Sequence, residues 1–192
     1  MKTSTGALNH VNIIMVTNLV NAINNLKKYG AKKFIIDLRG NPGGNLNAVV
    51  DMCNNILPEG VIVYTEDKNG KRVDYTSDGK NELQIPLVLL VDGGSASASE
   101  IMAGAIKDYK KGTLIGTTTF GKGIVQSVLP LGDGSAIKIT TSKYYTPNGN
   151  NIHKIGIEPD IEVKLDAEKY LEDGTDSQLE YAVDYLKKEI GK

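Results

Sequence analysis

Two spacings of apolar residues alternate along this chain, one typical of helices and one typical of buried strands. In four segments apolar side chains recur every three or four residues, which predicts helices that each bury one face. These segments cover about residues 16–26, 46–57, 98–109 and 177–190. Gly30 follows the first and Pro58 the second, and both residue types favour the end of a helix.

The strand-like segments are of two kinds. KFIIDL (33–38) and PLVLLVD (86–92) are continuous apolar runs, as expected for strands buried on both faces. The remaining strand-like segments, in chain order, are VIVYTED, KRVDYTS, TLIG, IVQSVLPL and SAIKITTSKYYT. Asn69-Gly70 and Asp133-Gly134 separate two pairs of them and predict hairpin turns. The predicted class is therefore α/β with substantial antiparallel content.

Each of the two buried strands is followed by a glycine-rich loop, RGNPGG (39–44) and GGSAS (93–97). Sites in α/β folds gather at loops that leave the carboxyl ends of such strands. The first loop is a rigid turn whose glycines either admit a substrate carbonyl or serve the turn alone. Asp37 and Arg39 flank it, and we interpret them as a structural ion pair or as hydrogen-bond partners of the loop, without a direct chemical role.

The second loop offers three serines, Ser95, Ser97 and Ser99, at the start of a predicted helix. Unpaired N–H groups at that position can stabilise an oxyanion, which would suit a nucleophilic serine. The string from Ser97 to Glu100 is also a capping box, S-x-x-E, so a purely structural role stays open.

Lys122 lies between two glycines, just before a strand-like segment. The string Gly116 to Lys122 matches a phosphate-binding loop, G-x-x-x-x-G-K. That function is rejected, because Gly123 replaces the metal-binding Ser or Thr and a strand follows where a helix is needed. A lysine can activate a serine hydroxyl when it is neutral, and burial favours the neutral amine. We therefore interpret the serine and the lysine together.

Composition narrows the class of partner. The chain has 192 residues, of which 40% are hydrophobic and 23% charged, so one domain with a sizeable core is expected. The net charge of −1 gives no reason to expect nucleic acid, and no apolar run is long enough for a membrane span. The single cysteine, Cys53, excludes an internal disulfide and is expected to pack as a small hydrophobe.

Taken together, five segments resemble the C-terminal processing peptidases, also called tail-specific proteases. They are DLRGNPGG (37–44), GGSASASEI (93–101), TFGKGIVQ (119–126), YYTPNG (144–149) and GIEPDI (156–161). They occur in the family's order and cover roughly residues 30–165. The resemblance implies a crotonase-like β/β/α core with additional antiparallel hairpins. It also implies a serine endopeptidase that cleaves polypeptides near their C-terminus without a metal or cofactor.

The resemblance also implies a role for each site residue. Ser97 is the nucleophile, Lys122 is the base and Gln126 orients the lysine. The oxyanion donors are the backbone N–H groups of Gly43 and Ala98. We expect Lys122 and Gln126 to lie on one side of a strand, since side chains alternate there. The polypeptide substrate is expected to bind as an added strand. The only histidine near these motifs, His153, lies in a polar loop and is interpreted as non-catalytic.

The family's usual PDZ domain is not recognised in this sequence. We divide the chain into an atypical N-terminal segment with the first helix, residues 1–30, and a peptidase catalytic core, residues 31–192, within a single domain. A fragment, a truncated product or a minimal variant is expected. The apolar surface left uncovered would favour a homo-oligomer. The family usually works outside the cytoplasm in the cell envelope, whereas the first 18 residues make a poor secretory signal.

Two alternatives from other classes stay open. The first is a non-catalytic peptide-binding domain that keeps these residues without aligning them. The second is a crotonase-like enzyme that acts on an acyl thioester, which the sequence supports only through the rejected phosphate loop.

Overall fold

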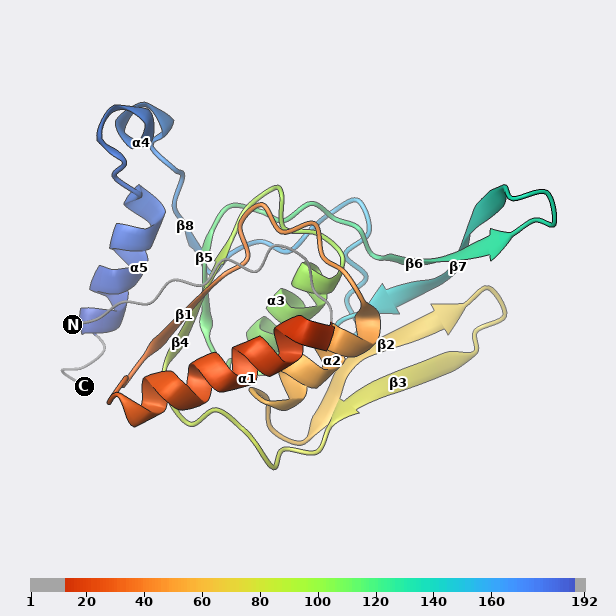
Figure 1. The fold of residues 1–192 in the computed structure, drawn as a ribbon, viewed down its shortest axis with the longest axis horizontal. Helices are drawn as coiled ribbons and strands as arrows, with labels where there is room; N and C mark the ends of the chain where they lie inside the picture. The colour runs from red at the N-terminus through yellow and green to blue at the C-terminus, as the bar shows by residue number, and fades with distance from the viewer. Residues whose placement is uncertain (1–12, 189–192) are drawn as a thin grey trace.

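The computed structural model describes residues 13–188. Residues 1–12 of the predicted N-terminal segment (residues 1–30) therefore lie outside the described residues. Two four-stranded sheets organise the described chain (Figure 1). The first is parallel, with strand order β1-β4-β5-β8. Its strands are β1 (Phe34–Asp37), β4 (Leu87–Val91), β5 (Thr113–Gly116) and β8 (Ile161–Glu162).

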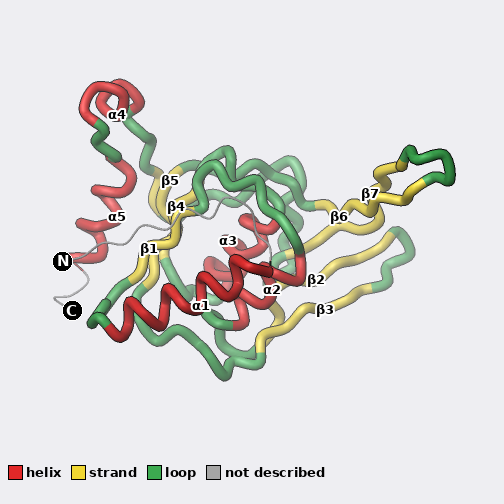
Figure 2. Tube along the Cα trace, in the orientation of Figure 1, coloured by secondary structure: helices red, strands yellow, loops and turns green. Residues whose placement is uncertain are grey.

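The second sheet is antiparallel, with strand order β3-β2-β7-β6. Its strands are β2 (Gly60–Asp67), β3 (Arg72–Ser77), β6 (Ile124–Pro130) and β7 (Ala136–Tyr145). The β2–β3 and β6–β7 hairpins extend away from the helices, on the side of the molecule opposite α5 (Figure 2). Strands β3 and β6 are therefore the two edges of this sheet.

Helices cover both faces of the parallel sheet. They are α1 (Ile13–Lys28), α2 (Leu46–Asn54) and α3 (Ala98–Asp108) on one face and α5 (Ser177–Lys188) on the other, whereas α4 (Ala167–Asp173) buries no residue and lies outside both layers. Alternate residues of β4 explain the arrangement, because Leu87 and Leu89 belong to the core shared with α1, α2 and α3. Val88 and Leu90 belong to a second core shared with α5. A strand with a helix layer on each face needs apolar residues at every position, which accounts for its unbroken apolar run.

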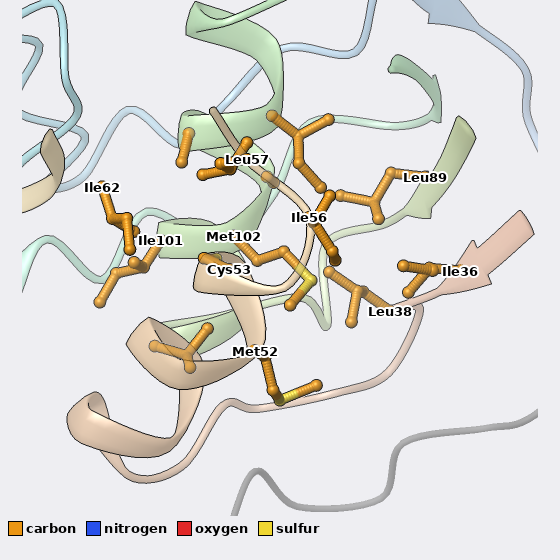
Figure 3. Packing of buried hydrophobic residues seen from close by; sticks show 14 of the residues in the cluster. Ile36, Leu38, Met52, Cys53, Ile56, Leu57, Ile62, Leu89, Ile101 and Met102 are labelled. Carbon is orange, nitrogen blue, oxygen red and sulfur yellow. The ribbon is translucent and has the colours of Figure 1, made fainter. Parts of the chain in front are cut away.

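The larger core lies between the parallel sheet and the first three helices. Figure 3 shows side chains of β1, β4, α2 and α3 meeting there, with Met52 and Cys53 from α2 among them. Cys53 is fully buried, and this burial raises the pKa of its thiol to about 12. The prediction that it packs as a small hydrophobe is confirmed. Leu19 and Ile23 of α1 join the same core, so the described part of residues 1–30 packs onto the rest of the described chain.

The predicted mixed α/β class is confirmed, and two short elements are additional. Strand β8 has only two residues, too few for a periodic pattern. Helix α4 buries none of its residues and thus shows no apolar stripe; Asp166 caps its start and Gly174, with φ 77°, ends it. No helix in the described range is long and apolar enough to span a membrane.

Candidate active site

The two glycine-rich loops lie against each other at the carboxyl ends of β1 and β4. The Ser95 hydroxyl donates to the backbone oxygen of Leu38 at 2.8 Å. The Ala96 N–H and the Ser99 hydroxyl both donate to the backbone oxygen of Asn41 at 3.0 Å. Ser95 and Ser99 are buried and hold the loops together, so these two serines have structural roles. Ser97 is half-buried and is the remaining candidate nucleophile.

Ser97 has a strained backbone at the junction between β4 and α3. Its φ is 55° and its ψ is −114°, a conformation that side-chain-bearing residues rarely adopt. Strained backbones cluster at active sites, and a sharp strand-to-helix turn is one way to expose a nucleophilic serine. The adjacent Ala98 N–H has no acceptor in the described part of the chain. That N–H is therefore available to a developing oxyanion.

Glu100 connects the serine loop to the lysine loop. Its side chain is completely buried, and its Oε2 accepts the backbone N–H groups of Ser97 at 2.8 Å and Lys122 at 2.9 Å. Its Oε1 accepts the Thr119 hydroxyl at 2.6 Å and the Gly121 N–H at 2.7 Å. The backbone nitrogens of Ser97 and Lys122 thus donate to the same oxygen atom. The distance between these nitrogens therefore cannot exceed the summed lengths of the two hydrogen bonds. We call Glu100 with these four donors the glutamate clamp.

The local sequence around Glu100 indicates only the second member of a capping box. The glutamate half of that capping box is present, because the Ser97 N–H donates to the Glu100 carboxylate. The bonds to residues 119–122 come from a segment about twenty positions away, and nothing in the local pattern indicates them. The available signal was a glutamate in a stretch of otherwise small and apolar residues, where a carboxylate must be buried and so needs several donors.

Tyr144 of β7 contacts the clamp from the second sheet. Its hydroxyl donates to the backbone oxygen of Ser97 at 3.2 Å. Burial, and then the negative charge of Glu100, raise the pKa of Tyr144, so its hydroxyl stays protonated and remains a donor. Through this bond the antiparallel sheet contributes directly to the position of the Ser97 backbone.

Gly43 approaches the serine more closely than any larger residue could. A Cβ atom on Gly43 would lie 2.5 Å from the backbone oxygen of Ala96, 2.7 Å from the backbone nitrogen of Ala98 and 2.8 Å from the Cβ of Ser97. The structure therefore brings both predicted oxyanion donors to Ser97. The Gly43 N–H itself donates to the Asn41 side-chain oxygen at 2.9 Å. To hold an oxyanion, Gly43 would have to exchange this acceptor for the substrate.

The glycines on either side of Lys122 are explained by a neighbouring loop. The Lys154 N–H donates to the backbone oxygen of Gly121 at 2.7 Å. A Cβ on Gly123 would lie 2.6 Å from the backbone nitrogen of His153. Residues with side chains at either position would separate the loops. Lys122 is half-buried, and its amine makes no hydrogen bond or ion pair with the residues that the structure describes.

The prediction that Lys122 and Gln126 lie on one side of a common strand is wrong. Strand β6 begins at Ile124, so Lys122 precedes it, and the register with β7 shifts between Val125 and Gln126. Strict alternation of side chains therefore does not apply across this segment. The Gln126 amide donates to the Thr140 hydroxyl at 3.4 Å. It makes no hydrogen bond with Lys122 among the described residues. An orienting role for Gln126 stays a prediction.

Two further predictions concern this region: that residues 116–122 are not a phosphate-binding loop and that His153 is not catalytic. A strand follows Lys122, as the rejection of a phosphate-binding loop required. His153 places its backbone against Gly123, and its Nδ1 is buried without a hydrogen-bond partner among the described residues. Nothing in these contacts joins the imidazole to Ser97.

Arg39 ties the first loop to the C-terminal helix. Its guanidinium donates to Asp37 at 2.6 Å, to Asp176 at 2.7 Å and to Gln178 at 2.9 Å. Burial opposes its charge, but the hydrogen bonds to Asp37 and Asp176 outweigh burial and raise the pKa of Arg39. Burial alone would raise the pKa of Asp176, but the hydrogen bond from Arg39, the charge of Arg39 and backbone N–H donors together outweigh burial and lower that pKa. The predicted structural ion pair is confirmed and extends to α5.

We expect Arg39→Ala to lower the free energy of unfolding by about 2 kcal/mol, because two partly buried carboxylates lose their partner. The difference should shrink below about pH 4, since the lowered pKa of Asp176 stabilises the fold only while the carboxylate is charged. Urea denaturation at pH 7 and pH 3 measures both effects. Lys187→Ala, which breaks an exposed pair with Asp184, is the control and should leave the midpoint unchanged. Equal midpoints for the two variants would contradict the prediction.

A strained serine at a strand-to-helix junction, held beside a glycine-flanked lysine, is typical of acyl-transfer hydrolases. Comparison with known proteins is more specific. Residues 9–163 match peptidase family S41, and the chain belongs to this family. The predicted resemblance to C-terminal processing peptidases is thereby confirmed.

Individual relatives agree with this placement. A carboxyl-terminal-processing protease of Synechocystis sp. is 44% identical over 170 residues, which are 88% of this chain and 40% of that protein. The carboxy-terminal processing protease CtpA of Bacillus subtilis is 43% identical over 148 residues, 77% of this chain and 32% of that protein. The solved photosystem II D1 C-terminal processing protease has a TM-score of 0.77 at 39% identity, over 82% of this chain and 41% of that one. The chain thus spans less than half the length of these relatives.

Proposed function

We propose that this chain carries the catalytic centre of a serine endopeptidase that cleaves polypeptides near their C-terminus, with Ser97 as nucleophile and Lys122 as base. The glutamate clamp is the observation that carries the proposal. One oxygen of Glu100 holds the backbones of both residues, 25 positions apart in sequence. A capping box alone would not require the lysine loop.

The chemistry is acyl transfer in two steps. The neutral amine of Lys122 takes the hydroxyl proton of Ser97 as the serine oxygen attacks a peptide carbonyl carbon. The oxyanion is held by the Ala98 N–H and, after release of Asn41, by the Gly43 N–H. The lysine then gives its proton to the leaving amine. In the second step water, deprotonated by the lysine, attacks the acyl-enzyme, and the proton returns to Ser97.

A non-catalytic peptide-binding form is the second candidate, and two observations favour it. The Gly43 N–H is already paired with Asn41, and the Gln126 amide contacts Thr140 and not Lys122. Both observations describe a site whose residues are present but incompletely aligned. The polypeptide would then be bound without being cleaved.

Covalent labelling with a fluorophosphonate separates the two candidates. We expect the wild-type chain to be labelled, Ser97→Ala to abolish labelling and Lys122→Ala to slow it by about 1,000-fold, as expected when a general base is lost. Lys80→Ala, at an exposed position where the lysine pairs only with Asp78 among the described residues, is the control and should label normally. A folded wild-type chain that is never labelled would favour the binding form.

The pH dependence of labelling tests the base itself. A general base accepts a proton only in its deprotonated form, so the rate should rise from acid to alkaline pH. Labelling that is flat over this range in an active sample would contradict a lysine base.

A further inference from the structure

The edge of the antiparallel sheet that begins at the candidate base is open and uncharged. Strand β6 starts two residues after Lys122 and is the last strand in the order β3-β2-β7-β6. Among the described residues no strand pairs with its other edge. The sequence of β6, IVQSVLP, contains no charged residue. An unpaired edge exposes backbone donors and acceptors that can hydrogen-bond to an incoming strand.

The opposite edge of the same sheet is built differently. Strand β3, with the sequence RVDYTS, carries Arg72 and Asp74, which form an exposed ion pair on its surface. Charges on an edge strand are a usual protection against pairing with another chain. Strand β6 has a register shift between Val125 and Gln126 and a proline at its end, Pro130, but the stretch between them carries no charge and so lacks the charged protection of β3.

The β6–β7 hairpin also has an apolar face without a cover. Leu129 of β6 lies opposite Ile137 of β7, and Ser127 lies opposite Ile139, so these four side chains share one face. Leu129 is 50% exposed, Ile137 46% and Ile139 41%. The hairpin extends away from the helices, so none of them packs on this face (Figure 1). We call Leu129, Ile137 and Ile139 the hairpin face.

We propose that the free edge of β6 pairs with the polypeptide substrate, whose alternate apolar side chains pack on the hairpin face. The inference rests on the proposed function and specifies where the substrate strand lies. The occupant is a substrate because the open edge leads directly from Lys122, so a strand paired there is led to the candidate nucleophile. Backbone pairing would accept many sequences, while the hairpin face would select chains with apolar residues at every second position.

Peptide binding tests the proposal without requiring catalysis. The probe is a fluorescent extended peptide with valine or leucine at alternate positions, titrated onto the Ser97→Ala chain. Adding Leu129→Lys should weaken binding about tenfold, because a charged side chain replaces apolar contact area. Adding Val73→Lys, at a 44% exposed position on β3, should change nothing. A version of the peptide methylated at alternate backbone nitrogens should lose affinity for the unaltered edge, because it cannot donate to β6.

The outcomes are distinct. Equal binding by Leu129→Lys and Val73→Lys, or equal binding of the methylated peptide, would overturn the proposal. A Leu129→Lys chain that changes only its oligomeric state in light scattering would assign the hairpin face to a second copy and would also overturn it. Fluorophosphonate labelling of Val73→Lys in a chain with Ser97 intact should equal wild type. Failure of the wild-type chain to label would count against the peptidase alone, since the peptide titration still decides the binding edge.

Discussion

Glu100→Gln should lower kcat/KM for a polypeptide substrate by at least about 100-fold and the free energy of unfolding by about 3 kcal/mol. An ionised carboxylate accepts at both oxygens, whereas a glutamine amide accepts at only one. In either orientation of the amide, its NH2 group would face at least one buried N–H donor that has lost its acceptor. The backbones of Ser97 and Lys122 would then separate, although the side chain keeps its size.

The clamp is a positioning device, so the loss should fall on kcat more than on KM. Steady-state kinetics and urea denaturation of Glu100→Gln measure the two effects. Glu172→Gln on exposed α4 makes the same change of charge and should leave both quantities unchanged. Glu100→Asp keeps the charge but is shorter, and intermediate activity is expected from it. Wild-type kcat in a folded Glu100→Gln chain would show that the clamp does not position the pair.

Gly43→Ala is the second large effect, with an expected loss of about 3 kcal/mol of stability and of at least about 100-fold in activity. The new methyl group would meet two backbone atoms and the Cβ of Ser97 at 2.5–2.8 Å, and none of these can rotate away. The φ of 95° adds strain for any residue other than glycine. The loops must therefore part, which moves the Ala98 N–H away from the oxyanion position.

Gly70→Ala separates the two causes. Gly70 has a φ of 79° in the β2–β3 turn, and a Cβ there would meet nothing within 4 Å. This control carries the backbone strain without the clash, so it should lose only about 1 kcal/mol and keep wild-type activity. Thermal denaturation and fluorophosphonate labelling of both variants give the comparison. If Gly43→Ala behaves like Gly70→Ala, the close approach of the two loops is unimportant to the site.

Periodicity was a reliable guide where an element buries a face. The apolar run that became β4 and the stripe that includes Met52 and Cys53 in α2 both have the predicted type. Helix α4 escaped prediction because it lies on the surface, where no burial imposes a pattern. The prediction that Lys122 and Gln126 alternate along one strand failed for two reasons. Strand β6 begins at Ile124, after Lys122, and its register with β7 shifts between Val125 and Gln126.

The choice among three serines shows the same limit within the site. Ser95, Ser97 and Ser99 are equivalent in local sequence, and only the resemblance to known peptidases favoured the middle one. The structure distinguishes them through Leu38 and Asn41, whose backbone oxygens occupy the hydroxyls of the outer two. Those oxygens belong to a loop more than fifty residues earlier.

By itself, the sequence determined the α/β class, the buried strands, the two glycine-rich loops and membership of the peptidase family, because these follow from local periodicity and short motifs. Only the tertiary structure decided that Glu100 joins Ser97 to Lys122, that Gly43 lies against the serine and that β6 is an edge with no partner strand among residues 13–188. Each of these depends on which distant backbones come within hydrogen-bonding or van der Waals distance. That is settled when the helices and sheets pack, and a one-dimensional pattern does not record it.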